Sequence, residues 1–304
     1  MVWSEKLKAH LGLLGTNFFF ATNYSAIKYL IGKNEGGPFA INLVRIGVSL
    51  VLFWSLPLFG KREPSLKRRD LPRLLLCAAA AIGLNQMLFI KGLSLTYSIH
   101  AALLTLMTPI LITVLAARIL KENLTYQKMA GLILGASGAI LLVSMRAQGH
   151  AGENAMEGDL LVLLSAVAYT FYFILVKPLM NTYSAATVMR WVFTFGFFLV
   201  LPVSYGEFLA VNWSLYSLKD WGLLGLVTIP GTFLAYLFNA YGIQKLSASV
   251  AGAYIYSQPV FAVVIAMGFL GEELSLVRVV AALLIFGGVF LSNTRVVPPK
   301  LPQR

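Results

Sequence analysis

The residue types that most often carry out catalysis are few in this sequence, and their spacing matches no catalytic or zinc motif. His10, His100 and His150 stand far apart, whereas the helical zinc motif H-E-x-x-H brings two histidines onto one face. The run GASG at 135–138 misses the G-x-S-x-G elbow of serine hydrolases by one position. An intramembrane enzyme is therefore the least favoured interpretation, and we expect neither a metal nor a cofactor.

The side chains that could bind a solute are amides, tyrosines and a tryptophan within otherwise apolar stretches. In residues 220–242, helical spacing puts Thr228, Thr232, Tyr236 and Asn239 along one side. Serine and threonine in such stripes also suit contacts between helices, whereas amides in the middle of a membrane are costly to bury and useful for holding a polar solute. The predicted substrate-binding residues are Asn85, Gln86, Tyr169, Trp191, Tyr236, Asn239, Tyr254 and Gln258.

Two arginines, Arg45 and Arg190, lie well inside apolar stretches at roughly matching places in the two halves of the chain. An intramembrane charge is a functional candidate by default, and either arginine could bind a substrate carboxylate. The alternative is a structural role, with the guanidinium held by backbone carbonyls or extended to an interface, and the matched positions favour it. No Asp or Glu lies in the middle of a stretch, so downhill flux or exchange is expected in place of a carboxylate proton relay.

Two prolines interrupt apolar stretches at corresponding positions. Pro109 and Pro259 differ by 150 positions, and each stretch ends in glutamate. A proline within a helix removes the hydrogen bond to the carbonyl four residues earlier, which predicts free carbonyls at Thr105 and Ile255. Such carbonyls cannot face lipid, so we expect both near mid-depth and close together. A gating role and simple bending of the helices remain equal alternatives.

The composition places these residues in a polytopic helical membrane protein. The chain has 304 residues, of which 58% are hydrophobic and 12% charged, with a mean hydropathy of +0.78. A soluble domain is about a quarter charged. The net charge of +12 need not indicate nucleic acid, because lysine and arginine of membrane proteins gather in cytoplasmic loops. The expected partners are a lipid bilayer and a small-molecule substrate, without nucleic acid, and a monomer is compatible with the sequence.

Ten hydrophobic segments are predicted, joined by short connections. With the N-terminus in the cytoplasm, most lysines and arginines between segments fall on the cytoplasmic side, including the run KREPSLKRRD at 61–70. This distribution predicts a multi-pass protein of the cell (inner) membrane with both termini in the cytoplasm. The segments span residues 9–31, 39–59, 72–92, 98–119, 127–145, 158–177, 184–204, 220–242, 248–270 and 276–293.

The second half of the sequence repeats the first. Gly92 pairs with Gly242 at the same offset of 150 positions that separates the two prolines. Each half contains five predicted crossings, an odd number, so the second copy must be inverted relative to the first. Inverted repeats of this kind are typical of transporters. The sequence thus predicts an all-α fold of ten transmembrane helices arranged as two inverted five-helix repeats, 1–148 and 153–304.

These features resemble the EamA-type family of the drug/metabolite transporter (DMT) superfamily. The resemblance is carried by TNFFFATNYSAIKYL, INLVRIGVSLVLFW and the paired blocks ending in ARILKENLT and GFLGEELS. It implies a cavity built by segments 1–4 and 6–9, with segments 5 and 10 peripheral, and alternating access by rocking. The positions that match the family pattern are Lys28, Arg45, Pro109, Glu122, Lys177, Arg190, Pro259 and Glu272.

The predicted function is secondary transport, without ATP, of a small organic metabolite such as an amino acid or a related amphipathic solute. The resemblance implies export more often than import. The absence of a mid-segment carboxylate favours a neutral or zwitterionic solute, and an exporter of organic cations, drugs or polyamines is the alternative. A channel or a membrane scaffold is a further alternative, although neither needs a repeated pair of interrupted segments.

Overall fold

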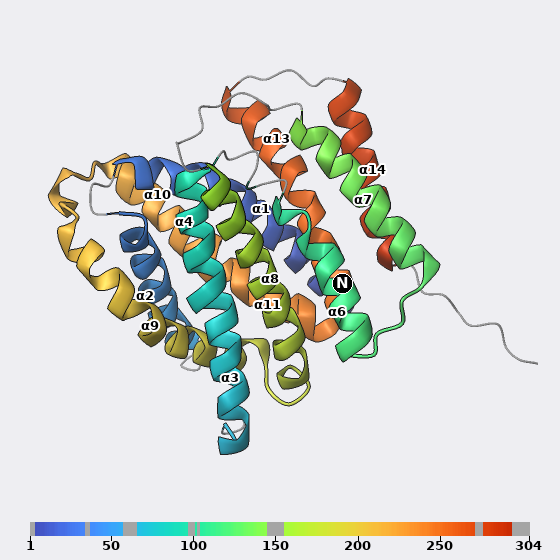
Figure 1. Cartoon of the computed structure of the whole chain (residues 1–304), viewed down its shortest axis with the longest axis horizontal. Coiled ribbons are helices and arrows are strands. Elements are labelled where there is room, and N and C mark those ends of the chain that lie inside the picture. Colours follow the sequence, from blue (N-terminus) through green and yellow to red (C-terminus); the bar gives the residue numbers. More distant parts are fainter. Residues whose placement is uncertain are drawn as a thin grey trace, which may run out of the picture.

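The computed structural model is a bundle of helices standing side by side (Figure 1). Every element among the residues that it describes is a helix, which confirms the predicted all-α class. His100 and Glu272 lie outside the described residues. The structure describes residues 4–33, 37–56, 66–96, 101, 104–144, 155–270 and 276–293.

The described helices overlap the predicted hydrophobic segments. Four stretches are long and apolar enough to cross a membrane by length and composition, namely Arg68–Leu95, Ala155–Leu179, Ala185–Ala210 and Leu218–Lys245. The uninterrupted helices are α1 (Glu5–Lys33), α2 (Phe39–Ser55), α6 (Thr108–Ile119), α7 (Tyr126–Ser144), α8 (Ala155–Leu179), α9 (Ala185–Ala210) and α14 (Leu276–Asn293). The interrupted ones are α3–η3–α4 (Leu71–Ala78, Ala79–Gln86, Met87–Leu95), α10–η5–α11 (Leu218–Thr228, Ile229–Leu234, Ala235–Lys245) and α12–η6–α13 (Ala248–Ala253, Tyr254–Ser257, Gln258–Leu270).

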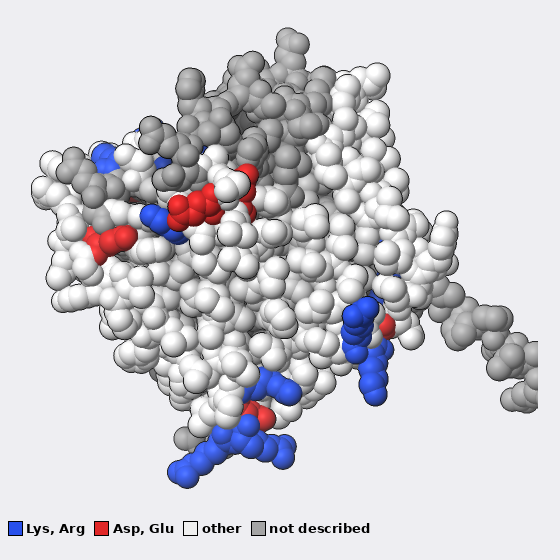
Figure 2. All heavy atoms as spheres, viewed as in Figure 1, with Lys and Arg blue, Asp and Glu red and all other residues white. Residues whose placement is uncertain are grey.

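Charged side chains lie toward two opposite edges of the molecule. On the face shown in Figure 2 they form an upper and a lower group, and the broad band between the groups carries none. Exposed basic residues lie at one end of the bundle: Lys67 directly before the short helix η2 (Arg68–Asp70), Arg68 and Arg69 within it, and Arg73 at the start of α3. A charge-free band flanked by charged edges is the surface that a bilayer requires.

Serine side chains start three helices of the second half. Ser184 and Ser247 accept hydrogen bonds from backbone N–H groups three residues later, which caps α9 and α12. Ser217 and Asp220 form a reciprocal capping box at the start of α10. These caps satisfy N–H groups that have no partner within the helix, and they fix where each helix begins.

Two long helices contain a π-helical stretch at corresponding places. The stretches are η3 and η5, which begin at Ala79 and Ile229. Pro230 accounts for the second, because it lacks the N–H group that an α-helix would use. Thr232 then donates to the carbonyl of Val227 at 2.7 Å, which satisfies part of the disturbed backbone. Stretch η3 contains no proline, so its π geometry could not be read from such a signal.

The two repeated prolines stand at helix starts, which corrects the expected bend within continuous helices. Pro109 lies in the first turn of α6, after a turn in which the Met107 N–H donates to the Leu104 carbonyl at 3.1 Å. Pro259 lies in the first turn of α13, directly after the 3-10 helix η6. A proline in a first turn removes no helical hydrogen bond. Each chain segment therefore breaks before its proline and restarts as a new helix.

Helices of the two halves pack against each other in matched pairs. Helix α1 contacts α11 and α13, while α8 contacts α4 and α6. A shift of half the chain relates α1 to α8, α11 to α4 and α13 to α6. The contacts of α1 therefore correspond to the contacts of α8. Helices α2 and α9 contact each other, as do α7 and α14. In each of these pairs the two helices occupy equivalent places in the two halves.

Glycines bring α7 and α14 into backbone contact at one edge of the bundle (Figure 1). A Cβ atom on Gly131 would lie 2.5 Å from the carbonyl oxygen of Gly288, and one on Gly288 would lie 2.5 Å from that of Gly131. A Cβ on Gly138 would lie 2.7 Å from the carbonyl oxygen of Ala281. Small residues allow helices to approach this closely, and larger side chains do not fit here.

We expect Gly288→Ala to lower the free energy of unfolding by about 1–3 kcal/mol, because the new methyl group overlaps backbone atoms of α7. The measurement is thermal unfolding of the purified protein in detergent. Gly222→Ala is the matched control, since no atom lies within 4 Å of a Cβ at that helical position. Equal melting temperatures for the two variants would contradict the tight contact.

Candidate functional site

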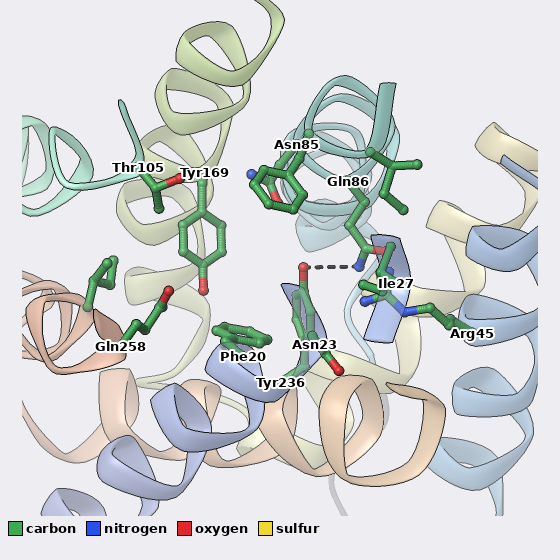
Figure 3. A pocket seen from close by; sticks show the side chains of 13 residues that line it. Phe20, Asn23, Ile27, Arg45, Asn85, Gln86, Thr105, Tyr169, Tyr236 and Gln258 are labelled. Carbon is green, nitrogen blue, oxygen red and sulfur yellow. Dashed lines mark hydrogen bonds between the residues drawn. The ribbon is translucent and has the colours of Figure 1, made fainter. Parts of the chain in front are cut away.

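A pocket of about 110 Å³ lies between helices of both halves of the chain (Figure 3). Its walls come from α1, α2, η3–α4, the helical residue Thr105 before α6, α8, α11 and η6–α13. The lining residues are Phe20, Asn23, Ile27, Arg45, Asn85, Gln86, Phe89, Ile90, Thr105, Tyr169, Tyr236, Ile255 and Gln258. The wall is thus largely apolar with a few polar groups, as is typical of sites for small molecules.

A hydrogen bond between Gln86 and Tyr236 lies on one wall of the pocket. The Gln86 amide nitrogen donates to the Tyr236 hydroxyl at 3.0 Å, and both side chains are buried. The Tyr236 ring makes edge-to-face contacts with Phe193 at 5.3 Å and Phe20 at 5.9 Å between ring centroids. Gln86 ends η3 and Tyr236 follows η5, so the two π stretches deliver the two partners to the same point.

A chain of amides fixes the orientation of Gln258 on α13. The Asn17 amide nitrogen donates to the Leu13 carbonyl at 2.7 Å, so its oxygen faces Gln258. The Gln258 nitrogen donates to that oxygen at 2.8 Å. Because an amide nitrogen only donates, the carbonyl oxygen of Gln258 is the atom left to accept a hydrogen bond in the pocket.

The two intramembrane arginines have different surroundings. Arg45 is buried and lines the pocket; its Nε donates to the Thr232 hydroxyl at 3.0 Å and one Nη donates to the Asn42 amide oxygen at 3.4 Å. Arg190 instead stacks over Trp54, with its guanidinium carbon 5.0 Å from the ring centroid. Among the described residues, only the first of the pair belongs to the pocket.

Five of the eight predicted substrate-binding residues line the pocket, namely Asn85, Gln86, Tyr169, Tyr236 and Gln258. Trp191, Asn239 and Tyr254 are not among the lining residues that the structure describes. Trp191 packs edge-to-face on Trp54, Asn239 is buried on α11, and the Tyr254 hydroxyl lies 2.7 Å from Nδ1 of His10.

Both residues whose carbonyls were expected to be free also line the pocket. Thr105 is helical and lies just before the turn that precedes α6, and Ile255 lies within η6. The predicted site omitted Phe20, Asn23 and Phe89. Asn23 lies on a polar stripe of the first segment, seven residues after Thr16, so a signal for it existed. Aromatic wall residues such as Phe20 carry no such signal, because most of the segment is apolar.

Both halves of the chain match one family model. Residues 7–144 and residues 156–294 each match the EamA-like transporter family. The chain belongs to this family. The membership confirms the predicted relationship to the drug/metabolite transporter superfamily, and it identifies the chain as a membrane transporter.

Individual relatives of this EamA-like transporter cover most of its length. The uncharacterized transporter YetK of Bacillus subtilis is 26% identical over 245 residues, covering 80% of this chain and 74% of that protein. A protein of Streptantibioticus cattleyicolor named "Probable terminal-alkyne amino-acid exporter" is 29% identical over 292 residues, covering 95% of this chain and 94% of that protein. A crystal structure at 18% identity superposes with a TM-score of 0.75 over 95% of this chain and 96% of that one, which shows a shared fold.

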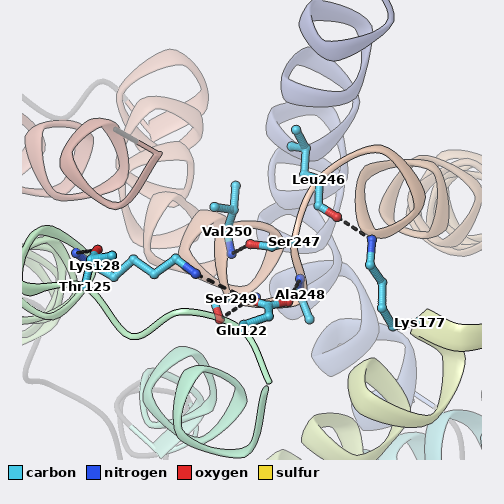
Figure 4. Close-up of polar contacts among 9 residues, drawn as sticks. All are labelled: Glu122, Thr125, Lys128, Lys177, Leu246, Ser247, Ala248, Ser249 and Val250. Carbon is cyan, nitrogen blue, oxygen red and sulfur yellow. Dashed lines mark hydrogen bonds and ion pairs between the residues drawn. The ribbon is translucent and has the colours of Figure 1, made fainter. Parts of the chain in front are cut away.

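Glu122 of this EamA-like transporter joins the two halves away from the pocket (Figure 4). Its carboxylate accepts hydrogen bonds from the Ser249 hydroxyl at 2.6 Å and the Ala248 N–H at 2.7 Å, at the start of α12. Lys128 lies 3.5 Å away, and Lys177 donates to the neighbouring Leu246 carbonyl. A carboxylate at a helix N-terminus is stabilised by unpaired N–H groups and by the helix dipole.

Burial alone would raise the pKa of Glu122, but hydrogen bonds from Ser249 and Ala248, with Lys128 nearby, outweigh it and hold the pKa below its ordinary value of 4.5. A carboxyl group with a lowered pKa in the folded state stabilises the fold above its unfolded pKa. That contribution is lost as the pH falls through the lower, folded value.

We therefore expect Glu122→Gln to unfold at a lower temperature than the unaltered protein at neutral pH, with the difference shrinking as the pH falls below about 4.5. Thermal unfolding in detergent across this range is the measurement. Glu157→Gln, which changes an exposed acid in the first turn of α8, is the matched control. A pH-independent difference for Glu122→Gln would refute an ionic role at this contact.

Proposed function

We propose that this protein is a secondary transporter that exports a small organic metabolite, an amino acid or a related amphipathic solute, by alternating access. The observation that carries the proposal is the pocket between the halves. It presents Gln86, Tyr236 and Gln258, together with one guanidinium, against an apolar and aromatic wall. A solute with an apolar body and polar ends complements such a wall.

The proposed architecture is ten membrane-spanning helices in two inverted repeats, residues 1–148 and 153–304. Three observations support it. The family model matches each half separately, and the contacts that α1 makes with the second half recur as the contacts that α8 makes with the first half. Gln86 and Tyr236 occupy equivalent places, 150 positions apart, and bind each other. Contacts between equivalent residues are expected at a two-fold axis, and in transporters such an axis runs through the substrate site.

In the proposed mechanism, rigid bodies rock about this axis and open the pocket to one side at a time. Helix α1 is ion-paired near both ends with α10–η5–α11, through Glu5 with Lys245 and through Lys33 with Asp220, so the two helices move together. The helix breaks before Pro109 and Pro259 are the proposed hinges, because a chain without continuous helical bonds bends more easily. Both termini and the basic cluster at Lys67–Arg73 face the cytoplasm of an inner membrane.

Two features favour an amino acid among possible solutes. The Streptantibioticus cattleyicolor relative carries the name of an amino-acid exporter. The described residues that line the pocket include an arginine but no aspartate or glutamate, whereas an organic cation or polyamine would need a negative partner.

Counterflow into proteoliposomes tests the proposal, with labelled amino acids, polyamines and quaternary ammonium compounds as the panel. We expect saturable, substrate-driven exchange of amino acids, which a channel or a scaffold does not give. Flux that does not saturate, or no exchange of any panel member by the correctly folded protein, would overturn the proposed function.

We expect Gln86→Ala to weaken solute binding by about 1–3 kcal/mol, because it removes one buried partner and leaves the Tyr236 hydroxyl unpaired. The measurement is binding to the purified protein, with the melting temperature as a check of folding. Gln127→Ala on the peripheral helix α7 is the matched control. Unchanged affinity in Gln86→Ala would remove this residue from the site.

A further inference from the structure

We propose that Arg45, with the amide oxygens of Asn23 and Gln86, binds the charged head of an α-amino acid whose apolar side chain extends along the pocket. This assignment rests on the proposed transport function and deepens it. It names the substrate class as apolar α-amino acids, with the carboxylate on Arg45 and the ammonium group on the two amide oxygens.

Within the described part of the chain, the guanidinium of Arg45 has no negatively charged partner. Its two hydrogen bonds go to a hydroxyl on Thr232 and an amide on Asn42, both uncharged. Its remaining N–H groups have no partner within the described part of the chain, and the described pocket wall contributes no carboxylate. Burying an uncompensated cation is costly, so an anionic group of the solute is the missing complement. A guanidinium presents two parallel N–H groups that match a carboxylate.

Two buried oxygen atoms of residues that line the pocket with Arg45 have no hydrogen-bond donor among the described residues. The Asn23 amide nitrogen donates a hydrogen bond to the Gly231 carbonyl at 2.6 Å, so the amide oxygen is the atom that points away from this carbonyl and can accept one. That oxygen and the amide oxygen of Gln86 are buried without a hydrogen-bond partner among the described residues. Gly231 precedes Thr232, which binds Arg45, so η5 holds the Asn23 and Arg45 side chains close together. The guanidinium can bind the carboxylate of an amino acid, and the two unpaired amide oxygens can accept hydrogen bonds from its ammonium group.

The rest of the pocket is suited to an apolar side chain. Figure 3 shows Arg45 and Gln86 at one end and Gln258 and Thr105 at the other, with Phe20 between them. Lining residues in addition to Phe20 include Phe89, Ile90 and Ile255, which offer apolar surface along this path. A solute whose head binds Arg45 therefore directs its side chain over this surface toward Gln258.

The repeat supplies an internal comparison for Arg45. Its counterpart Arg190 stacks on Trp54 and donates to the Thr187 hydroxyl at 3.4 Å, and it is not among the described lining residues. Each arginine donates to the side-chain oxygen three residues earlier, but the remaining contacts differ, with Thr232 for Arg45 and Trp54 for Arg190. The helices repeat in the two halves, but of the two arginines only Arg45 is among the described residues that line the pocket.

The test compares L-phenylalanine and L-leucine with their amides, which lack the carboxylate, and with 3-phenylpropionate, which lacks the ammonium group. Binding to the purified protein is measured by calorimetry. We expect the amides and 3-phenylpropionate each to bind at least about tenfold more weakly than the matching amino acid, because each lacks one of the two charged groups and loses its charge-assisted hydrogen bonds. Equal binding of an amino acid and its amide, or no binding of either amino acid, overturns the assignment.

Arg45→Gln should weaken amino-acid binding by about 10- to 100-fold and remove the preference over the amide, while Arg190→Gln should keep that preference. A preference retained in folded Arg45→Gln overturns the role of this residue. If Arg45→Gln does not fold, the unaltered protein's discrimination between acid and amide decides alone. In counterflow, exchange of amides as fast as amino acids leaves the proposed transport function standing and removes the head-group site, whereas no exchange of any solute removes the transport function itself.

Discussion

The hydrogen bond between Gln86 and Tyr236 is the contact on which the centre of the protein depends. It joins α3–η3–α4 to α10–η5–α11, the two long helices that carry π stretches. Within a membrane every polar group must find a partner inside the protein, and here each long helix supplies the partner of the other. The pocket lies beside this bond. The polar groups that can bind a solute are therefore those that are not already hydrogen-bonded within the protein.

Much of the fold could be predicted from the sequence because its signals are local. Apolar blocks of membrane length predicted the helices. The paired prolines predicted an interruption in two of them, although as a bend within a helix and not as the start of a new one. The π stretches were not predictable, since the choice of a wider turn depends on packing against neighbours, and η3 contains no proline. A π turn adds one residue and rotates the remainder of the helix by about 100°. Positions counted across η5 as if the helix were regular, such as Thr228 before it and Tyr236 after it, therefore need not face the same way.

The candidate site was predictable for its polar members and less so for its walls. Gln86 and Gln258 stand out because amides are rare in apolar segments, whereas Phe20 does not. The two arginines show the limit most clearly. Their similar positions indicated one shared role, but Thr232 on η5 and Trp54 on α2 give them different partners. Side-chain partners that come from elements far away in the chain cannot be read from spacing within one segment.

The Glu122 contact also has a consequence for biosynthesis. Helix α12 is six residues long, too short to be stable without help, and part of its N-terminal capping comes from a carboxylate more than a hundred residues earlier in the chain. Glu122 is synthesised before α12, so the carboxylate that helps to cap α12 is already in the membrane when α12 emerges. A gene split at the midpoint would separate the two, and α12 would then be completed only when the two polypeptides meet.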